Sequence, residues 1–284
     1  MKYYVLHNPL AGRGDRVDEK LEKVKSYLDG EFVYLDLTKL TDYSEILTKL
    51  NPEDKIVISG GDGTLNRFVN SVDVDAISND ILYYASGSGN DFLNDIGGNP
   101  DGSPIKINKY LLNLPTVTVK GKEYRFINGV GYGIDGYCCQ VGDEKKAKSP
   151  KPVDYTAIAI QGLLFGFKAK NATVWIDGNK YEFKKVWIAP TMNGRCYGGG
   201  MMPTPRQDRL GDGRLSFMCL YGSGKIRTLM IFPSIFKGEH VKHSDIITIY
   251  EGREITVEFD EPCALQIDGE TILDVKSYTV RARK

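Results

Sequence analysis

The first hundred residues alternate between short apolar runs and stretches with apolar residues at helical spacing. Four runs rich in β-branched and aromatic residues predict strands buried in a sheet, at residues 2–7, 31–37, 55–59 and 81–87. The stretches between them predict helices, at residues 15–28, at residues 42–50, after residue 63 and from residue 90. Strands and helices that alternate in this way predict a doubly wound, mostly parallel sheet.

The pattern changes near Pro115, where strand-like alternation replaces the helical spacing. Residues 116–129 and 172–183 each predict a hairpin, because two alternating runs flank a Lys-Gly or Asp-Gly pair. From Arg214 onward, nearly every apolar run is strand-like. This second half of the chain therefore predicts a β-rich fold of the sandwich type.

Helical spacing remains in the second half mainly at Val153–Phe167 and around Lys225–Phe236. We therefore expect a fold of the α/β class with two domains. A Rossmann-like, doubly wound domain would occupy residues 1–114, and a β-sandwich domain would occupy residues 115–284.

The composition is that of an ordinary globular protein. The formal net charge is zero, so no global basic field argues for a nucleic-acid partner. No apolar stretch is long enough to predict a transmembrane segment, and the N-terminus lacks a signal-peptide pattern. The five cysteines form no CxxC pair, which favours small buried residues in a reducing, cytoplasmic setting. The adjacent Cys138 and Cys139 are expected in a strand.

One stretch, VISGGDGTLNRFVN (Val57–Asn70), combines a strand-like run, a glycine loop and the start of a helix. The glycines would let a large anion approach the backbone at the carboxyl edge of the sheet, with Thr64 as the expected helix N-cap. This pattern favours a phosphate-binding loop, and a plain strand-to-helix turn is the alternative. The P-loop ending and the GxGxxG pattern are both absent, so a lysine cradle is not supported.

Asp62 lies within this glycine loop, where an acid would repel a bare phosphate. Its presence is explained if Mg²⁺ lies between them, because that ion binds through one or two carboxylates and phosphate oxygens. Two further glycine loops follow predicted strands, NPLAGRG (Asn8–Gly14) and GSGND (Gly87–Asp91). Each is weak evidence alone, but together they put three glycine loops on one edge of the sheet.

The motifs NPLAGRG, GGDGTLN and GSGNDF, in this order and spacing, resemble the diacylglycerol kinase catalytic domain family, which includes bacterial lipid kinases, sphingosine kinases and ceramide kinases. The resemblance extends over most of the chain, through NGVGYGID, YGGGMMPTPRQDRLGDGRL, FKGEH and QIDGE. GGDGT alone is less specific, because NAD kinases and phosphofructokinases share it. The combination of GSGNDF with DGE points to the lipid branch.

By this similarity, the first domain would bind ATP, with Asp62 acting through Mg²⁺. The implied nucleotide-binding residues are Asn8, Gly12, Thr38, Gly60, Gly61, Asp62, Gly63, Thr64, Asn66, Gly87, Ser88, Gly89, Asn90 and Asp91. The DGE motif implies that Asp268 and Glu270 supply the general base. If that segment were extended, the two acids would lie on the same side of it. The local alternative is an Asp-Gly hairpin turn with an exposed acid.

Some bacterial members of the family hold a second, structural Mg²⁺ at the loop that matches RLGDGR. The resemblance implies the Asp212 carboxylate and the carbonyls of Arg209 and Arg214 as ligands. Two departures affect this region. Thr204 stands where the family usually has alanine, and Gly211 stands where a second acid is frequent. The missing acid weakens the prediction of this metal site.

The resemblance implies an ATP- and Mg²⁺-dependent kinase of phospholipid metabolism whose substrate is a lipid alcohol such as diacylglycerol. A kinase of a soluble alcohol and a non-catalytic lipid- or nucleotide-binding regulator are the alternatives. The lipid would be met at a membrane surface by a peripheral protein that does not span the bilayer. A homodimer is compatible with the sequence, which does not fix the oligomeric state.

The expected membrane-docking segment is residues 224–243. Its predicted apolar centre lies between basic residues, a combination that favours anionic headgroups. The centre comprises Leu229, Met230, Ile231 and Phe232, and the basic residues are Lys225, Arg227, Lys237 and Lys242. A core helix with solvated basic ends is the alternative.

Overall fold

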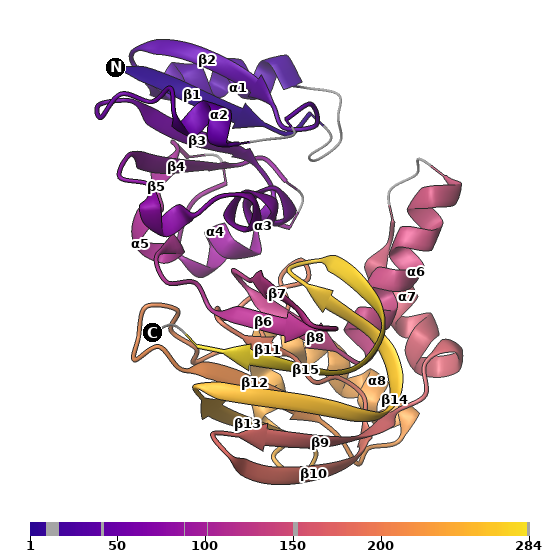
Figure 1. The fold of residues 1–284 in the computed structure, drawn as a ribbon. Coiled ribbons are helices and arrows are strands. Elements are labelled where there is room, and N and C mark those ends of the chain that lie inside the picture. The colour runs from indigo at the N-terminus through magenta and orange to yellow at the C-terminus, as the bar shows by residue number, and fades with distance from the viewer. Residues whose placement is uncertain (10–16, 41–42, 88, 101, 150–152, 283–284) are drawn as a thin grey trace. The chain divides into compact units, whose positions relative to one another are not determined.

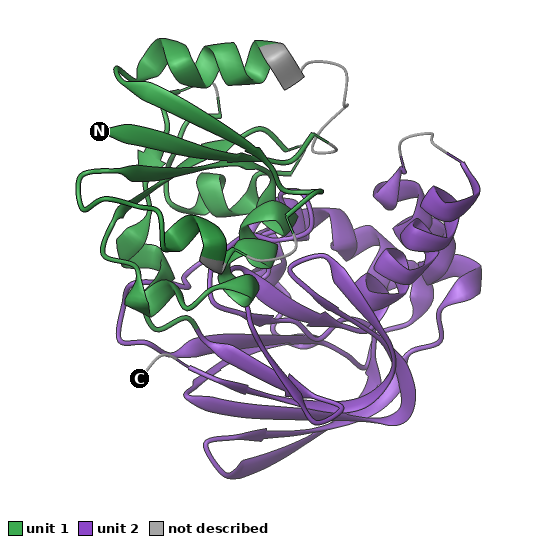
Figure 2. Cartoon of the chain, turned by 45° about the horizontal axis from the view of Figure 1, so that its top comes forward, with its two compact units in different colours: residues 1–114 green, residues 115–284 purple. Residues whose placement is uncertain are grey.

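The computed structural model describes residues 1–9, 17–40, 43–87, 89–100, 102–149 and 153–282. The chain divides into two compact units, Met1–Leu114 and Pro115–Lys284 (Figure 2). Each unit has its own sheet, so each is described by itself.

The first unit is built on a five-stranded sheet with the order β2-β1-β3-β4-β5 (Figure 1). The strands are β1 (Lys2–His7), β2 (Glu31–Asp36), β3 (Lys55–Gly60), β4 (Asp80–Ala85) and β5 (Ile105–Lys106). All pairs are parallel except β4 with β5. The β-branched run Ile56–Ile58 is fully buried in the central strand β3, as expected of a strand covered on both faces.

The helices of the first unit are short. They are α1 (Val17–Tyr27), α2 (Ser44–Leu47), α3 (Asp62–Ser71), the 3₁₀ turn η1 (Val74–Ala76), α4 (Asp91–Asp95) and α5 (Asn108–Leu111). The helix predicted at residues 42–50 is a single turn. Because the parallel strands β1, β2, β3 and β4 end at one edge, the loops that follow them are brought together there.

The second unit is an antiparallel β-sandwich. Ten strands belong to one hydrogen-bonded network among the described residues, and every pairing is antiparallel. They are β6 (Thr116–Val119), β7 (Lys122–Arg125), β8 (Gly129–Tyr132), β9 (Lys170–Ile176), β10 (Asn179–Val186), β11 (Thr191–Met192), β12 (Leu215–Leu220), β13 (Ile247–Gly252), β14 (Glu254–Ile267) and β15 (Glu270–Arg281). The predicted fold class, a doubly wound α/β unit followed by a β-sandwich, is confirmed.

The helices of the second unit differ in one respect from the prediction. They are α6 (Ile134–Lys148), α7 (Tyr155–Gln161), the π-turn η2 (Gly162–Gly166), α8 (Lys225–Ile231), and the 3₁₀ turns η3 (Phe232–Lys237) and η4 (Glu239–Lys242). The helix α6 was not predicted, and Cys138 and Cys139 lie in it rather than in a strand. Gly136 and Gly142 lower its helix propensity, so packing must stabilise it.

Candidate functional site

The helix α3 begins earlier than the sequence predicts. Its N-cap is Gly61, and the helix starts at Asp62, so Thr64 is in the first turn instead of capping it. The Thr64 hydroxyl oxygen accepts a hydrogen bond from the Asn8 side-chain amide at 3.2 Å. Asn8 follows β1, so this contact ties the first of the three glycine-rich loops to the second.

Two of the glycine loops approach each other through bare backbone. A Cβ atom built on Gly87 would lie 2.5 Å from the Gly61 Cα, and one built on Gly61 would lie 3.1 Å from the Gly87 Cα. The Ser86 N–H also donates to the Gly60 carbonyl at 2.9 Å. Glycine is therefore required here for the contact between the loops themselves, in addition to any ligand.

The Asp62 carboxylate connects the GGDGT segment to the helix α4. Its two oxygens accept hydrogen bonds from the backbone N–H groups of Asp91 and Phe92, each at 2.9 Å. These N–H groups belong to the first turn of α4, where a negative charge is favourable. The sequence motif GGDGT thus carries a structural contact that sequence reasoning did not predict.

Two buried polar groups lie close to these acids. Burial raises the pKa of Tyr83, and the negative charges of Asp62 and Asp91 raise it further. Asn90 adopts a left-handed backbone conformation, with φ of 52°. Within the described part of the chain, the Tyr83 hydroxyl and the Asn90 Oδ1 have no hydrogen-bond partner. Buried polar atoms of this kind are costly, so they mark a place where a ligand could supply the partner.

The other predicted nucleotide-binding residues have differing surroundings. Thr38 is exposed after β2, where its hydroxyl donates to Asp36 at 2.6 Å. Asn66 is buried within α3, and its oxygen accepts from the Asn70 amide at 3.3 Å. Gly63 is in the first turn of α3, and Gly89 directly precedes Asn90. Gly12 and Ser88 lie outside the described residues.

A magnesium ion would fit the acids of this edge. The Asp62 carboxylate accepts from the Asp91 backbone N–H at 2.9 Å, so the fold makes these two acidic residues neighbours. Mg²⁺ is usually held by one or two carboxylates, phosphate oxygens and water. A carboxylate oxygen can accept more than one bond, so the contacts of Asp62 with the backbone leave this role compatible with the geometry.

Asp268 of the DGE motif lies in a hairpin turn, which is one of the two alternatives that the sequence left open. Asp268 and Gly269 have φ of 47° and 94° and join β14 to β15. The Asp268 carboxylate accepts from three successive backbone N–H groups, those of Ile127 (2.5 Å), Asn128 (2.8 Å) and Gly129 (3.0 Å). The acid is therefore not simply exposed, and it fixes the turn against the segment that enters β8.

The Ile127 carbonyl and the Asn128 side chain are also hydrogen-bonded. The buried guanidinium of Arg209 donates to the Ile127 carbonyl (3.2 Å) and to the Asn128 side-chain oxygen (3.1 Å). The Asn193 side chain donates to the Ile127 carbonyl as well, at 2.8 Å. The side chain of Arg209 thus supports the segment that binds Asp268.

A buried polar chain supports the turn from its other side. The Gly269 N–H donates to the Gln266 side-chain oxygen at 2.7 Å, and the Gln266 side chain also hydrogen-bonds Asp135. The Tyr197 hydroxyl donates to Asp135 at 2.8 Å. Burial raises the pKa of Asp135 to about 6, although these hydrogen bonds oppose the rise.

Glu270 differs from Asp268 in its surroundings. It is exposed and is the first residue of β15, opposite Ile267 across the hairpin. The next residue, Thr271, donates its hydroxyl to Asp143 of α6 at 2.7 Å. The fold therefore keeps the two acids of DGE adjacent, with one anchored and one at the surface.

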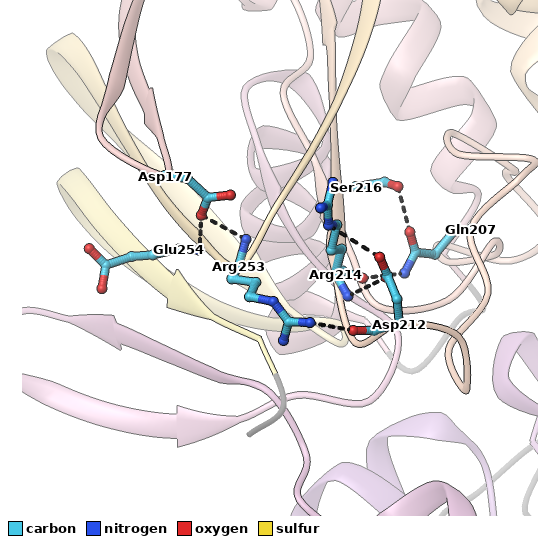
Figure 3. A network of polar contacts seen from close by, with 7 residues as sticks. All are labelled: Asp177, Gln207, Asp212, Arg214, Ser216, Arg253 and Glu254. Carbon is cyan, nitrogen blue, oxygen red and sulfur yellow. Dashed lines mark hydrogen bonds and ion pairs between the residues drawn. The ribbon is translucent and has the colours of Figure 1, made fainter.

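The predicted second metal site has competing contacts (Figure 3). The Asp212 carboxylate accepts from the Arg214 N–H at 3.0 Å and pairs with the Arg214 guanidinium at 3.2 Å. The Arg214 carbonyl accepts from Gln207 at 2.8 Å, and the Asp212 carbonyl accepts from Arg253 at 2.7 Å. Among the described residues, no group of three or more acidic, His or Cys side chains could hold a metal. A bound cation would have to share or replace these contacts, and the second metal site stays a prediction.

Sequence reasoning missed Asn128, Asp135, Tyr197 and Gln266. Gln266 offered a signal, because a polar residue between Leu265 and Ile267 in a strand must find a partner when it is buried. His240 is buried, and its Nε2 lies 2.8 Å from the Pro203 carbonyl.

Comparisons with known proteins match both units. The diacylglycerol kinase catalytic domain model matches residues 2–117, and the YegS C-terminal NAD kinase beta sandwich-like domain model matches residues 128–280. YtlR of Bacillus subtilis (strain 168), a protein provisionally named as a lipid kinase, is 22% identical over 297 residues, which cover 94% of this chain and 93% of YtlR.

A second relative and a solved structure are also similar to this chain. A protein of Mycobacterium tuberculosis (strain H37Rv) named diacylglycerol kinase is 24% identical over 201 residues, covering 69% of this chain and 64% of its own. A crystal structure described as a diacylglycerol kinase from Bacillus anthracis str. Sterne has a TM-score of 0.66 at 21% identity, covering 100% of this chain and 94% of that chain. The chain therefore belongs to the kinase family in which a diacylglycerol kinase catalytic domain is joined to a YegS C-terminal β-sandwich domain.

Proposed function

We propose that this protein is an ATP-dependent kinase that transfers the γ-phosphate of ATP to the hydroxyl of a lipid alcohol. The observation that carries the proposal is the bare contact of Gly61 with Gly87 beside the carboxylates of Asp62 and Asp91. Bare backbone at the carboxyl edge of a parallel sheet suits a phosphate chain, and phosphoryl transfer depends chiefly on positioning and charge stabilisation.

The loop Gly60–Thr64 and the residues Gly87, Gly89 and Asn90 would bind the phosphates, because the glycines present no side chain of their own to the ligand. Asp62 and Asp91 would hold magnesium, which when bound neutralises charge on the phosphate oxygens. The Asn90 amide, whose oxygen is buried without a partner among the described residues, would hydrogen-bond the nucleotide or a bound water. Asn8 would maintain the loop through Thr64.

The DGE turn would supply the base for the acceptor hydroxyl. A base has to accept a proton at an oxygen that faces the substrate. Asp268 uses its carboxylate to bind three N–H groups, whereas Glu270 is exposed. Both acids remain candidates, with Asp268 held in one orientation and Glu270 able to reach outward. We assign no step of the transfer to a second metal at Asp212, where the carboxylate pairs with the Arg214 guanidinium.

A lipid is proposed as the acceptor because relatives carry the names lipid kinase and diacylglycerol kinase. We propose that the protein meets this substrate at the surface of a membrane. No helix among the described residues has the length and apolarity that a bilayer crossing requires. The five cysteines are free thiols in the described structure, which supports a reducing, cytoplasmic setting.

The test is ATP consumption by the purified protein with a panel of acceptors. Dioctanoylglycerol, ceramide and a sphingoid base would be presented in mixed micelles, with NAD and glycerol as soluble alcohols alongside. We expect turnover with at least one lipid alcohol, dependent on magnesium. Turnover with a soluble alcohol alone would replace the lipid proposal with a soluble-alcohol kinase. ATP binding without turnover on any acceptor would favour a non-catalytic regulator.

A further inference from the structure

Three large apolar side chains of the second unit are strongly exposed. The exposed fractions are 84% for Phe165, 73% for Ile226 and 69% for Met230. We call these three residues the apolar tip. A single exposed apolar side chain needs no explanation, but several from packed segments form the kind of patch that marks an interaction surface.

The fold brings the two parts of the tip to neighbouring positions. Phe165 lies in η2, which packs against α8, the helix that carries Ile226 and Met230. The ammonium of Lys225, at the start of α8, donates to the Leu164 carbonyl at 2.8 Å. Phe165 therefore directly follows Leu164, whose carbonyl is bound by a residue of α8.

The helix α8 has apolar residues on two faces. Thr228 and Ile231 are buried, whereas Ile226 and Met230 are one turn apart on the face toward solvent. A helix that packs only against a core presents polar residues on its outer face. The outer face of α8 is thus unlike that of an ordinary surface helix.

Two residues of the expected docking segment are buried, so the set of apolar residues that could contact a membrane differs from the one expected from the sequence. Ile231 and Phe232 are 6% and 8% exposed and belong to the core of the second unit. Arg227 pairs with Asp245 at 2.6 Å, so its charge is compensated. Met230 is the residue of the predicted apolar centre that is strongly exposed, and it forms the apolar tip together with Phe165 and Ile226.

The segments that carry the tip are basic in a chain without net charge. Residues 153–168 and 224–245 contain five Lys or Arg residues against three Asp or Glu residues, while the whole chain has 37 of each. Lys168 is exposed and lies three residues after Phe165. It also lines an open hollow of about 310 Å³ together with Gly166, Lys170 and Tyr137. Cations beside apolar side chains complement an anionic bilayer surface.

We propose that the apolar tip inserts into the headgroup layer of a bilayer that contains anionic phospholipid, with Lys168 and Lys225 facing the headgroups. This inference deepens the proposed function by naming the surface that meets the lipid, and it rests on that function only for the identity of the substrate. Phe165, Ile226 and Met230 would supply the apolar contact, and the lysines would supply the preference for anionic lipid.

The test is binding of the full chain to vesicles, measured by sedimentation. Vesicles of phosphatidylcholine alone would be compared with vesicles that contain about one third phosphatidylglycerol, at low and high salt (about 0.1 and 1 M). The variants are Phe165→Ser, the pair Ile226→Ser with Met230→Ser, and Lys168→Glu. Leu112→Ser is the matched control, because Leu112 is 45% exposed in the other unit. Unfolding midpoints would be measured for every variant.

We expect the unmodified chain to bind the anionic vesicles and this binding to weaken at high salt. At low salt, the affinity should fall by about tenfold or more in Phe165→Ser, and it should also fall in the Ile226–Met230 pair and in Lys168→Glu. Leu112→Ser would bind as the unmodified chain does. Binding that all tip variants retain, or no binding by the unmodified chain, overturns the proposal. A dimer in solution that Phe165→Ser dissociates, without vesicle binding, would assign the tip to a second copy instead. Vesicle binding is measured without turnover, so failure of the kinase proposal is a separate outcome.

Discussion

The Asp62 carboxylate binds the backbone N–H of Asp91, 29 residues further along the chain, at 2.9 Å. The two acids of the motifs GGDGT and GND are therefore joined by a direct contact. Asp62 thus holds the start of α4 in place and also presents a negative charge at the proposed phosphate site.

Replacing Asp62 by asparagine should affect both roles. We expect Asp62→Asn to lower transfer on the order of 10²-fold or more, because the charge that would hold magnesium is lost. The free energy of unfolding should fall by about 1 kcal/mol, because one oxygen no longer accepts from α4. Asp75→Asn is the control, since Asp75 also accepts from a backbone N–H in this unit, at 2.8 Å from Asn113. An Asp62→Asn enzyme with full turnover would rule out the role in transfer.

The contact of Gly61 with Gly87 predicts a graded effect of added methyl groups. Gly87→Ala should weaken ATP binding more than Gly61→Ala, because its Cβ would lie closer to the opposite backbone. We expect at least about a tenfold weaker affinity in Gly87→Ala, measured by calorimetry. Gly224→Ala, whose Cβ would meet nothing within 4 Å, is the control. Reduced stability with unchanged ATP affinity would mean that the loops contact each other but not the nucleotide.

Replacing the two acids of the DGE motif should have different effects on the free energy of unfolding. Asp268→Asn should lower the free energy of unfolding by about 1–3 kcal/mol, because backbone N–H groups at Ile127–Gly129 would lose a full carboxylate partner. Glu270→Gln should change it by less than about 0.5 kcal/mol, because Glu270 is exposed. Turnover should fall by about 10²–10⁴-fold in a variant that lacks the base, with ATP affinity retained.

Chemical denaturation and steady-state rates would be compared for both variants. If Glu270→Gln remains active and only Asp268→Asn is slow, Asp268 is the better candidate for the base. If neither variant is slow, the base lies outside the DGE turn.

Asp135 predicts a pH dependence of stability. Its pKa in the folded protein is about 6, against an ordinary value of 3.8, so the folded state binds the proton more tightly. Stability from this group is therefore fully present below about pH 4 and is lost as the pH rises through 6. Asp135→Asn should remove this dependence, so the variant should gain stability relative to the unmodified protein between pH 4 and 6. Denaturation across this range would measure the difference, and a constant difference would contradict the assignment.

Local signals in the sequence predicted much of the fold. The run Ile56–Ile58 is β-branched and continuous, which is enough to define a buried strand. The turns at Lys120-Gly121 and Asp177-Gly178 have positive φ at both residues, as the hairpin signal requires. Each of these elements depends on residues that are adjacent in the chain.

The remaining features depend on distant contacts. Thr64 is a favourable N-cap by type, but α3 begins at Asp62, whose carboxylate binds α4. The helix α6 contains two interior glycines and is stabilised by packing that no local pattern records. The bonds of Asp268 reach residues that lie about 140 positions earlier, so the sequence could identify the acid but not its partners.

The amide hydrogens of Ile127, Asn128 and Gly129 all point into one carboxylate. Their exchange with deuterated solvent therefore requires the DGE turn to move away from the start of β8. The three amides should exchange together, at a rate set by the opening of the β14–β15 hairpin end. They provide an isotopic probe of whether the turn is closed, which can be followed in the resting protein before any substrate is known.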